Sequence, residues 1–162
     1  MVTASESGTT VYATPSDCEL SATRVFDAPL RLVWEAWTKP EHVSRWLLGP
    51  EGWTMPVCEI DLRSGGAWRY VWRKENGREM EMTGVYREVV PMARLVHTER
   101  WGPEWPESIN AYDFVERAGR TTVTLTVTYP SKAVRDAAME TGMTRGIDVS
   151  FDRLDLMLPT LG

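Results

Sequence analysis

The sequence predicts one α+β domain in which a curved antiparallel sheet wraps round a long C-terminal helix and leaves an internal cavity. Three features lead to this prediction: a strand followed at once by two short helices, then β-rich runs at hairpin spacing, then a proline-free segment with helical periodicity. A chain of 162 residues is long enough to bury the core of one such domain. We therefore expect the domain to span 19–162, after a flexible Ser/Thr-rich tail over 1–18.

The beginning of the domain reads as a strand over 24–27 followed by two short helices. Ala28-Pro29 separates the strand from the first helix, and Pro40 suits the first turn of the second. The apolar faces of the two helices are Leu30, Val33 and Trp37, and then Val43, Trp46 and Leu47. A strand and two short helices in this order can start a sheet that curls round a cavity.

Six β-rich runs follow the helices. They cover 53–62, 67–74, 79–89, 94–101, 109–116 and 121–128. Short turn sequences separate most of them, which is typical of antiparallel hairpins. Between the second and third runs, Asn76-Gly77 predicts a type I′ turn, in which both central residues have positive φ.

The last segment, from about 131 to 158, contains no proline and predicts one long amphipathic helix lying on the sheet. Its apolar stripe recurs every three or four positions at Met139, Met143, Ile147, Ser150, Leu154, Met157 and Leu161. The first turns fit this stripe less well, so a separate or bent first piece stays open.

Composition and charge exclude several classes of protein. The formal net charge is −5 and the basic residues are scattered, which argues against a nucleic-acid surface. No apolar run approaches the roughly 18–20 residues of a membrane span, and the first residues lack a secretory signal pattern. Cys18 and Cys58 form no paired motif, so we expect no disulfide and a cytoplasmic location.

Motifs for metal, phosphate, dinucleotide and serine-hydrolase sites are absent from the sequence, so we expect no cofactor and no metal. What remains is an apolar cavity with few polar groups, lined by the residues that share one face of each strand. The candidate ligand-binding residues are Trp37, Trp46, Trp68, Tyr70, Trp72, Met80, Met82, His97, Glu99, Tyr112, Phe114, Gly142, Met143, Gly146 and Ile147. The alternative is a filled core with close helix-to-sheet packing, and the residue pattern is compatible with both.

His97 and Glu99 are the polar exceptions, because they share a strand face with Leu95 and Trp101. A buried charge is costly unless it is paired, so one interpretation is a pair that orients a ligand or transfers a proton. The other is a solvated strand end with two ordinary surface residues. If His97 faces the cavity, ligand binding should change between about pH 5 and 8, where an unperturbed histidine titrates.

Several short stretches, together with the order of elements, carry a resemblance to a known family: 26–29, 33–38, 40–42, 45–46, 59–66, 84–89, 94–96, 142–143 and 152–154. They resemble the START-like helix-grip (SRPBCC) superfamily. Within it, the chain is similar to the branch named for the activator of the heat-shock protein 90 ATPase. The resemblance implies a helix-grip fold of order β-α-α-β6-α with an internal cavity. In this branch the strand that carries His97 and Glu99 tends to hold apolar or aromatic residues at those places, so the chain departs from the pattern there.

Related START-like proteins include lipid carriers, polyketide cyclases and aromatases, and proteins that sequester natural products. The resemblance therefore implies binding of a lipophilic or aromatic small molecule, with natural-product metabolism or self-resistance as one setting. The alternatives are a chaperone-interacting module and a cyclase-like enzyme. Expected partners are a small molecule, no nucleic acid and no inserted membrane, for a monomer or weak homodimer.

Overall fold

The structure is a computed structural model that describes residues 8–162, and it confirms the predicted α+β helix-grip architecture. Residues 1–7 of the expected tail lie outside the described part. The strands are β1 (Thr10–Ala13), β2 (Glu19–Phe26), β3 (Trp53–Ile60), β4 (Ala67–Lys74), β5 (Glu79–Val90), β6 (Arg94–Trp101), β7 (Ser108–Arg117) and β8 (Arg120–Thr128). The helices are α1 (Leu30–Thr38), α2 (Pro40–Trp46), α3 (Lys132–Glu140) and α4 (Met143–Met157), with a 3₁₀ turn at Leu158–Thr160. None of the described helices is long and apolar enough to cross a membrane.

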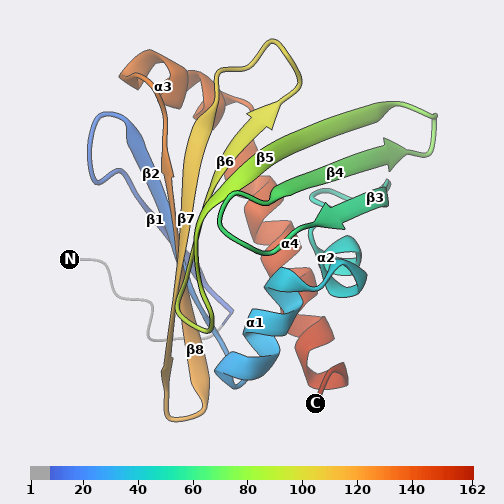
Figure 1. Ribbon diagram of the computed structural model, residues 1–162, viewed down its shortest axis with the longest axis vertical. Coiled ribbons are helices and arrows are strands. Elements are labelled where there is room, and N and C mark those ends of the chain that lie inside the picture. The colour runs from blue at the N-terminus through green and yellow to red at the C-terminus, as the bar shows by residue number, and fades with distance from the viewer. Residues whose placement is uncertain (1–7) are drawn as a thin grey trace.

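All eight strands form one antiparallel sheet in the order β1-β2-β8-β7-β6-β5-β4-β3. Figure 1 shows that β3, β4 and β5 diverge from the other strands, and that α1, α2 and α4 occupy the inner side of this bend. The β5–β6 pairing shifts register between Tyr86 and Glu88, and β-bulges of this kind bend and twist a strand. The bend is what leaves room for helices and aromatic side chains inside the sheet.

The turn between β4 and β5 differs in type from the turn between β7 and β8. The prediction of a type I′ turn at Asn76-Gly77 is wrong. Gly77 has φ 89°, but Asn76 does not have a positive φ. The Gly77 N–H donates to Lys74 O over 2.9 Å, so a three-residue loop connects β4 and β5. The two positive φ values of a type I′ turn occur instead at Ala118 (53°) and Gly119 (76°), between β7 and β8.

The C-terminal helical segment is two helices, and the prediction of one continuous helix from about 131 is wrong. Gly142 has φ 84°, a left-handed conformation that ends α3 and precedes α4. The Ser131 hydroxyl caps α3 by accepting a hydrogen bond from Val134 N–H at 3.2 Å. The long helix that faces the sheet is α4 alone, and α3 is the separate first piece that the weaker periodicity left open.

The expectation of a flexible tail over 1–18 is wrong for residues 10–13, which pair with β2 as strand β1. The Tyr12 hydroxyl donates to Asp148 Oδ1 over 2.7 Å and lies 2.8 Å from Thr144 O, so β1 is also joined to α4. The sequence pattern missed this strand because it is only four residues long and each of its side chains is half-buried.

A cluster of aromatic rings fills the centre of the fold, and Trp37 of α1 is at its middle. Its ring lies 4.7 Å from that of Trp46, and 5.5–5.8 Å from those of Phe26, Tyr112, Phe114 and Phe151. The Trp46 N–H donates to Ala36 O over 2.8 Å, which fixes α2 against α1. Edge-to-face contacts of this kind add to the stabilisation from buried area and hold the two short helices in place.

Arg24 of β2 is buried and joins the sheet to α4. Its Nη2 donates to Asp152 Oδ1 over 2.8 Å and also to Asp155 Oδ2. Two carboxylates compensate the desolvation of this guanidinium group, which would otherwise be costly to bury. The contact anchors the C-terminal half of α4 on the inner side of the sheet.

Candidate functional site

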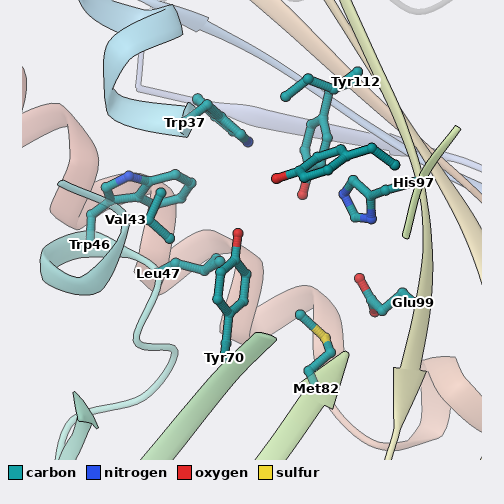
Figure 2. Close-up of a pocket in the computed structure, with 11 residues that line it drawn as sticks. Trp37, Val43, Trp46, Leu47, Tyr70, Met82, His97, Glu99 and Tyr112 are labelled. Carbon is teal, nitrogen blue, oxygen red and sulfur yellow. The ribbon is translucent and has the colours of Figure 1, made fainter. Parts of the chain in front are cut away.

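A small cavity of about 30 Å³ lies between the sheet and the two short helices. Its walls are Trp37, Val43, Trp46, Leu47, Tyr70, Met82, Tyr86, Leu95, His97, Glu99 and Tyr112. Figure 2 shows the hydroxyls of Tyr70 and Tyr112 and the side chains of His97 and Glu99 directed towards the shared space. A volume of this size corresponds to about one water molecule, so the cavity is much smaller than a drug-sized pocket of roughly 300–1,000 Å³.

Seven of the residues predicted from the sequence line this cavity. They are Trp37, Trp46, Tyr70, Met82, His97, Glu99 and Tyr112. Strand alternation explains the strand members, because one face of each of four adjacent strands, β4 to β7, points to the same interior space. The helices supply Trp37 and Trp46, whose rings close the opposite wall.

Four other predicted aromatic and methionine residues lie next to the cavity but not on its wall. Trp68 is buried behind Tyr70 and His97, with ring centroids 4.7 and 5.0 Å away. Trp72 stacks on Trp101 instead, with centroids 5.3 Å apart. Phe114 packs on Trp34 and Trp37, and Met80 is half-buried on β5. Alternation placed these side chains on the right face, but neighbouring rings cover them.

The four predicted residues from the C-terminal segment do not line the cavity. Gly142 is an exposed residue at the break between α3 and α4, and nothing lies within 4 Å of a Cβ built on Gly146. The Tyr129 hydroxyl lies 3.2 Å from Met143 Sδ, and Ile147 packs on both apolar clusters of the domain. The prediction of one cavity reaching from the β4 tryptophans to this face of the helix is therefore wrong, because Met143 and Ile147 pack against other side chains and do not line the cavity.

Sequence reasoning left four lining residues out of the candidate site: Val43, Leu47, Tyr86 and Leu95. Leu95 lies on the same face of β6 as His97, and Tyr86 lies on the same face of β5 as Met82. Alternation along these strands could therefore have found both. Val43 and Leu47 were assigned to the apolar face of α2, and only the tertiary structure shows that this face meets the cavity.

His97 is buried at the centre of the sheet and is neutral near pH 7. Its Nδ1 lies 3.2 Å from Thr98 O, and its ring packs between those of Trp68, Tyr86 and Tyr112. Burial lowers the pKa of His97 to about 4, because the imidazolium form loses its hydration, and the contact with Thr98 O opposes this only partly. The expectation that His97 titrates between pH 5 and 8 is therefore wrong.

Glu99 is the cavity group that titrates near neutral pH. Burial of its carboxyl group raises the pKa of Glu99 to about 7, and a hydrogen bond from Trp101 Nε1 at 2.8 Å opposes the rise. Among residues 8–162, Glu99 takes part in no ion pair, and His97 beside it carries no charge at this pH. Glu99 can therefore change between carboxylic acid and carboxylate near neutral pH.

The three tyrosines of the cavity supply neutral hydroxyl groups. Burial raises the pKa of Tyr70, Tyr86 and Tyr112 above the ordinary value of a tyrosine, so all three stay protonated at neutral pH. In the described part of the chain, the Tyr70 and Tyr86 hydroxyls have no hydrogen-bond partner. These hydroxyls can therefore donate to or accept from a group that enters the cavity.

Residues 8–162 hold no cluster of three or more His, Cys, Asp or Glu side chains that could bind a metal ion. Cys18 and Cys58 are both free thiols. Burial raises the pKa of Cys58 to about 12, so this thiol is neutral and a weak nucleophile.

The bent sheet, the inner helices and the small interior cavity define a protein of the START-like helix-grip class. The chain belongs to the family described as "Activator of Hsp90 ATPase homolog 1-like protein", which matches residues 27–158. None of the curated proteins compared with the chain matches it.

Solved structures from bacteria share the whole fold. A crystal structure of a Rhodobacter sphaeroides protein has a TM-score of 0.89 and 28% identity, covering 94% of this chain and 99% of that one. A Nitrosomonas europaea protein has a TM-score of 0.80 and 24% identity over 90% and 96% of the two chains. An AHSA1-like protein from Aeromonas hydrophila has a TM-score of 0.70 and 19% identity over 85% and 92%. At the identities of the last two, the likeness shows the fold alone.

Proposed function

We propose that this protein binds a lipophilic or aromatic small molecule, with a polar end of the ligand in the cavity. The observation that carries the proposal is the gathering of three tyrosine hydroxyls and the Glu99 carboxyl group at one aromatic-walled space. A few convergent polar groups within apolar walls are the usual composition of a ligand site, and a perturbed pKa among them adds to that argument.

The small volume of the cavity sets how such a ligand would bind. About 30 Å³ admits one polar head group, so the ligand body needs side chains to move. Met82 and Leu47 are two of the aliphatic members of the wall, and methionine in particular adapts to irregular shapes. Leu47 also follows directly after α2, where the chain leaves the helix. We therefore place ligand entry beside these two residues.

Benzyl alcohol, a neutral aromatic molecule with one hydroxyl, is a suitable probe. NMR titration should give saturable shifts of the Trp37 and Trp46 indole N–H signals. Leu47→Phe adds bulk to a cavity with little spare volume, and should weaken binding at least about tenfold. Leu62→Phe, the same substitution at an exposed position, is the control. Absence of saturable shifts, or equal weakening by both variants, would contradict the proposal.

A chaperone-binding role is a second candidate, and the description of the family favours it. It predicts that the protein associates with a heat-shock protein 90 and changes the rate of its ATPase. Pull-down together with an ATPase assay tests this, and Leu47→Phe should leave such an association unchanged if the cavity is not involved.

A cyclase-like activity is the enzymatic alternative, favoured by a carboxyl group whose pKa of about 7 suits proton transfer at neutral pH. Glu99 would then act as acid or base on a poly-ketone ligand held between the tyrosines. Turnover of such a compound by the unmodified protein, lost in Glu99→Gln, would support this alternative.

A further inference from the structure

We infer that the ligand of the cavity is an organic cation, an amine whose ammonium group lies against Glu99 inside the ring of aromatic side chains. This inference rests on the proposed function, because it assigns the chemical class of the ligand at the same site. Two independent observations lead to it: a half-buried carboxyl group without a counter-ion in the described part of the chain, and walls made largely of aromatic side chains.

Within the described residues 8–162, Glu99 has no positively charged partner. No lysine or arginine lines the cavity, and among residues 8–162 Glu99 forms no salt bridge. Its hydrogen bond comes from the neutral indole N–H of Trp101. A buried carboxylate that lacks a counter-ion is costly, and the usual compensation is an ion pair or protonation. A cationic ligand would supply the missing charge.

The walls opposite Glu99 suit a cation. Five aromatic side chains line the cavity besides His97: Trp37, Trp46, Tyr70, Tyr86 and Tyr112. The rings of Trp37 and Trp46 lie 4.7 Å apart, and that of Tyr112 lies 5.5 Å from Trp37, so they form one continuous surface. Ammonium groups are attracted to aromatic faces, and aromatic cages bind amines in this way. The volume of about 30 Å³ matches an ammonium head group in size.

Other titratable groups around Glu99 keep one charge state near pH 7. Facing it are Tyr70 of β4, Tyr86 of β5, His97 of β6, Tyr112 of β7 and Tyr129 after β8, with Cys58 of β3 behind Tyr70. Burial raises the pKa of each tyrosine and of the thiol, and lowers the pKa of His97 to about 4, so all are neutral. The lining residues from α1 and α2 are not titratable, and α4 contributes none. Glu99 is therefore the lining group whose charge changes between pH 6 and 8, and the Glu99→Gln variant tests whether a pH dependence of binding comes from it.

The sign of that dependence distinguishes a cation from a neutral ligand. With a pKa of about 7, about one-tenth of Glu99 is carboxylate at pH 6 and about nine-tenths at pH 8. A ligand that needs the carboxylate should bind about tenfold more tightly at pH 8, in proportion to the competent fraction. A neutral ligand that accepts a hydrogen bond from the carboxylic acid should show the opposite trend.

Benzylamine and benzyl alcohol test the inference, because they have nearly the same shape and only the amine is charged at both pH values. Binding is measured by NMR titration of the Trp101 indole N–H, which reports directly on Glu99. We expect benzylamine to bind about tenfold more tightly at pH 8 than at pH 6, and more tightly than benzyl alcohol at pH 8. Glu99→Gln should abolish both differences while benzyl alcohol still binds. Glu75→Gln, which removes an exposed carboxylate in the β4–β5 turn, is the matched control and should change neither.

The remaining outcomes overturn the inference, and they separate it from the proposed function. If benzyl alcohol binds, and benzylamine binds no more tightly at pH 8 than at pH 6, the cavity is a ligand site but not a cation site. If benzyl alcohol binds more tightly at pH 6, Glu99 acts as a hydrogen-bond donor to a neutral ligand. If Glu75→Gln reduces amine binding as much as Glu99→Gln, the effect is a general one of surface charge. If neither probe binds, the proposed function fails together with the cation site.

Discussion

Trp101 and Glu99 lie two residues apart on β6, and the Trp101 indole N–H donates a hydrogen bond to Glu99 Oε1 over 2.8 Å. The Trp101 ring also stacks on Trp72, whose own N–H donates to Leu47 O over 2.8 Å. These contacts connect the carboxyl group of the cavity to the end of α2. They also give the Glu99 carboxyl group a hydrogen-bond donor on a strand face that it shares with Leu95 and Trp101.

Trp101→Phe should raise the pKa of Glu99 further above its ordinary value. The substitution keeps a ring for stacking on Trp72 but removes the donor that favours the carboxylate. Loss of a hydrogen bond to a charged group corresponds to a rise of about one pKa unit. Carbon-detected NMR titration of the Glu99 carboxyl group measures the change. Trp105→Phe, at another exposed tryptophan, should leave it unaltered, and an unaltered pKa in Trp101→Phe would contradict this role.

His97→Phe should make the protein more resistant to acid. The pKa of His97 is about 4 in the folded state and about 6.5 when unfolded, so folding opposes its protonation. The unfolded state binds more protons over this range, and stability is therefore lost as pH falls from about 6.5 to about 4. The loss approaches about 3 kcal/mol, and the variant should not show it. Urea unfolding at several pH values tests this, and parallel pH profiles for the two proteins would refute it.

Glu99→Gln should reduce a loss of stability that occurs as pH rises, whereas His97→Phe removes one that occurs as pH falls. The folded pKa of about 7 lies above the unfolded value, so the folded state retains the proton longer. The unfolding free energy of the unmodified protein should therefore decline as pH rises from about 4.5 through about 7. In the glutamine variant that decline should be smaller. Thermal unfolding in buffers of equal ionic strength provides the measurement, and a larger decline in the variant would contradict the assignment.

Gly84→Ala and Gly146→Ala should have opposite effects on stability. A Cβ at Gly84 would lie 1.9 Å from Thr98 O and 2.5 Å from Trp68 Nε1, where a backbone carbonyl and a buried ring leave no space. We expect a loss of several kcal/mol or failure to fold. At Gly146 nothing lies within 4 Å, so alanine should stabilise α4 by about 0.5–1 kcal/mol. Denaturant unfolding compares the two, and a tolerated Gly84→Ala would show that β5 can move away from β6.

Tyr12→Phe should reduce the unfolding free energy by about 1 kcal/mol, because it removes the hydrogen bond to Asp148. Combined with Asp148→Asn in a double-mutant cycle, it should give a coupling energy of similar size. No measurable coupling would mean that the pairing of β1 with β2, rather than this contact, holds the N-terminal strand.

The class of fold and the faces of the strands were predictable from the sequence. Alternation along β4, β6 and β7 placed Tyr70, His97 and Tyr112 on the inner face, because the two-residue period of a strand is a local property of the backbone. The same period also selected Trp68, Trp72 and Phe114, and it cannot distinguish a residue on a cavity wall from one covered by a neighbouring ring.

Only the tertiary structure decided which of these side chains meet the cavity and how they ionise. Trp37, Tyr112 and the α2 side chains are among the walls that limit the cavity to about 30 Å³, and Met143 and Ile147 are not part of these walls. Desolvation moves the pKa values of His97 and Glu99 in opposite directions, to about 4 and about 7, because each neutral form needs less hydration than its charged form. Desolvation depends on atoms from distant parts of the chain, so the pH-sensitive residue of this site could not be assigned from spacing along one strand.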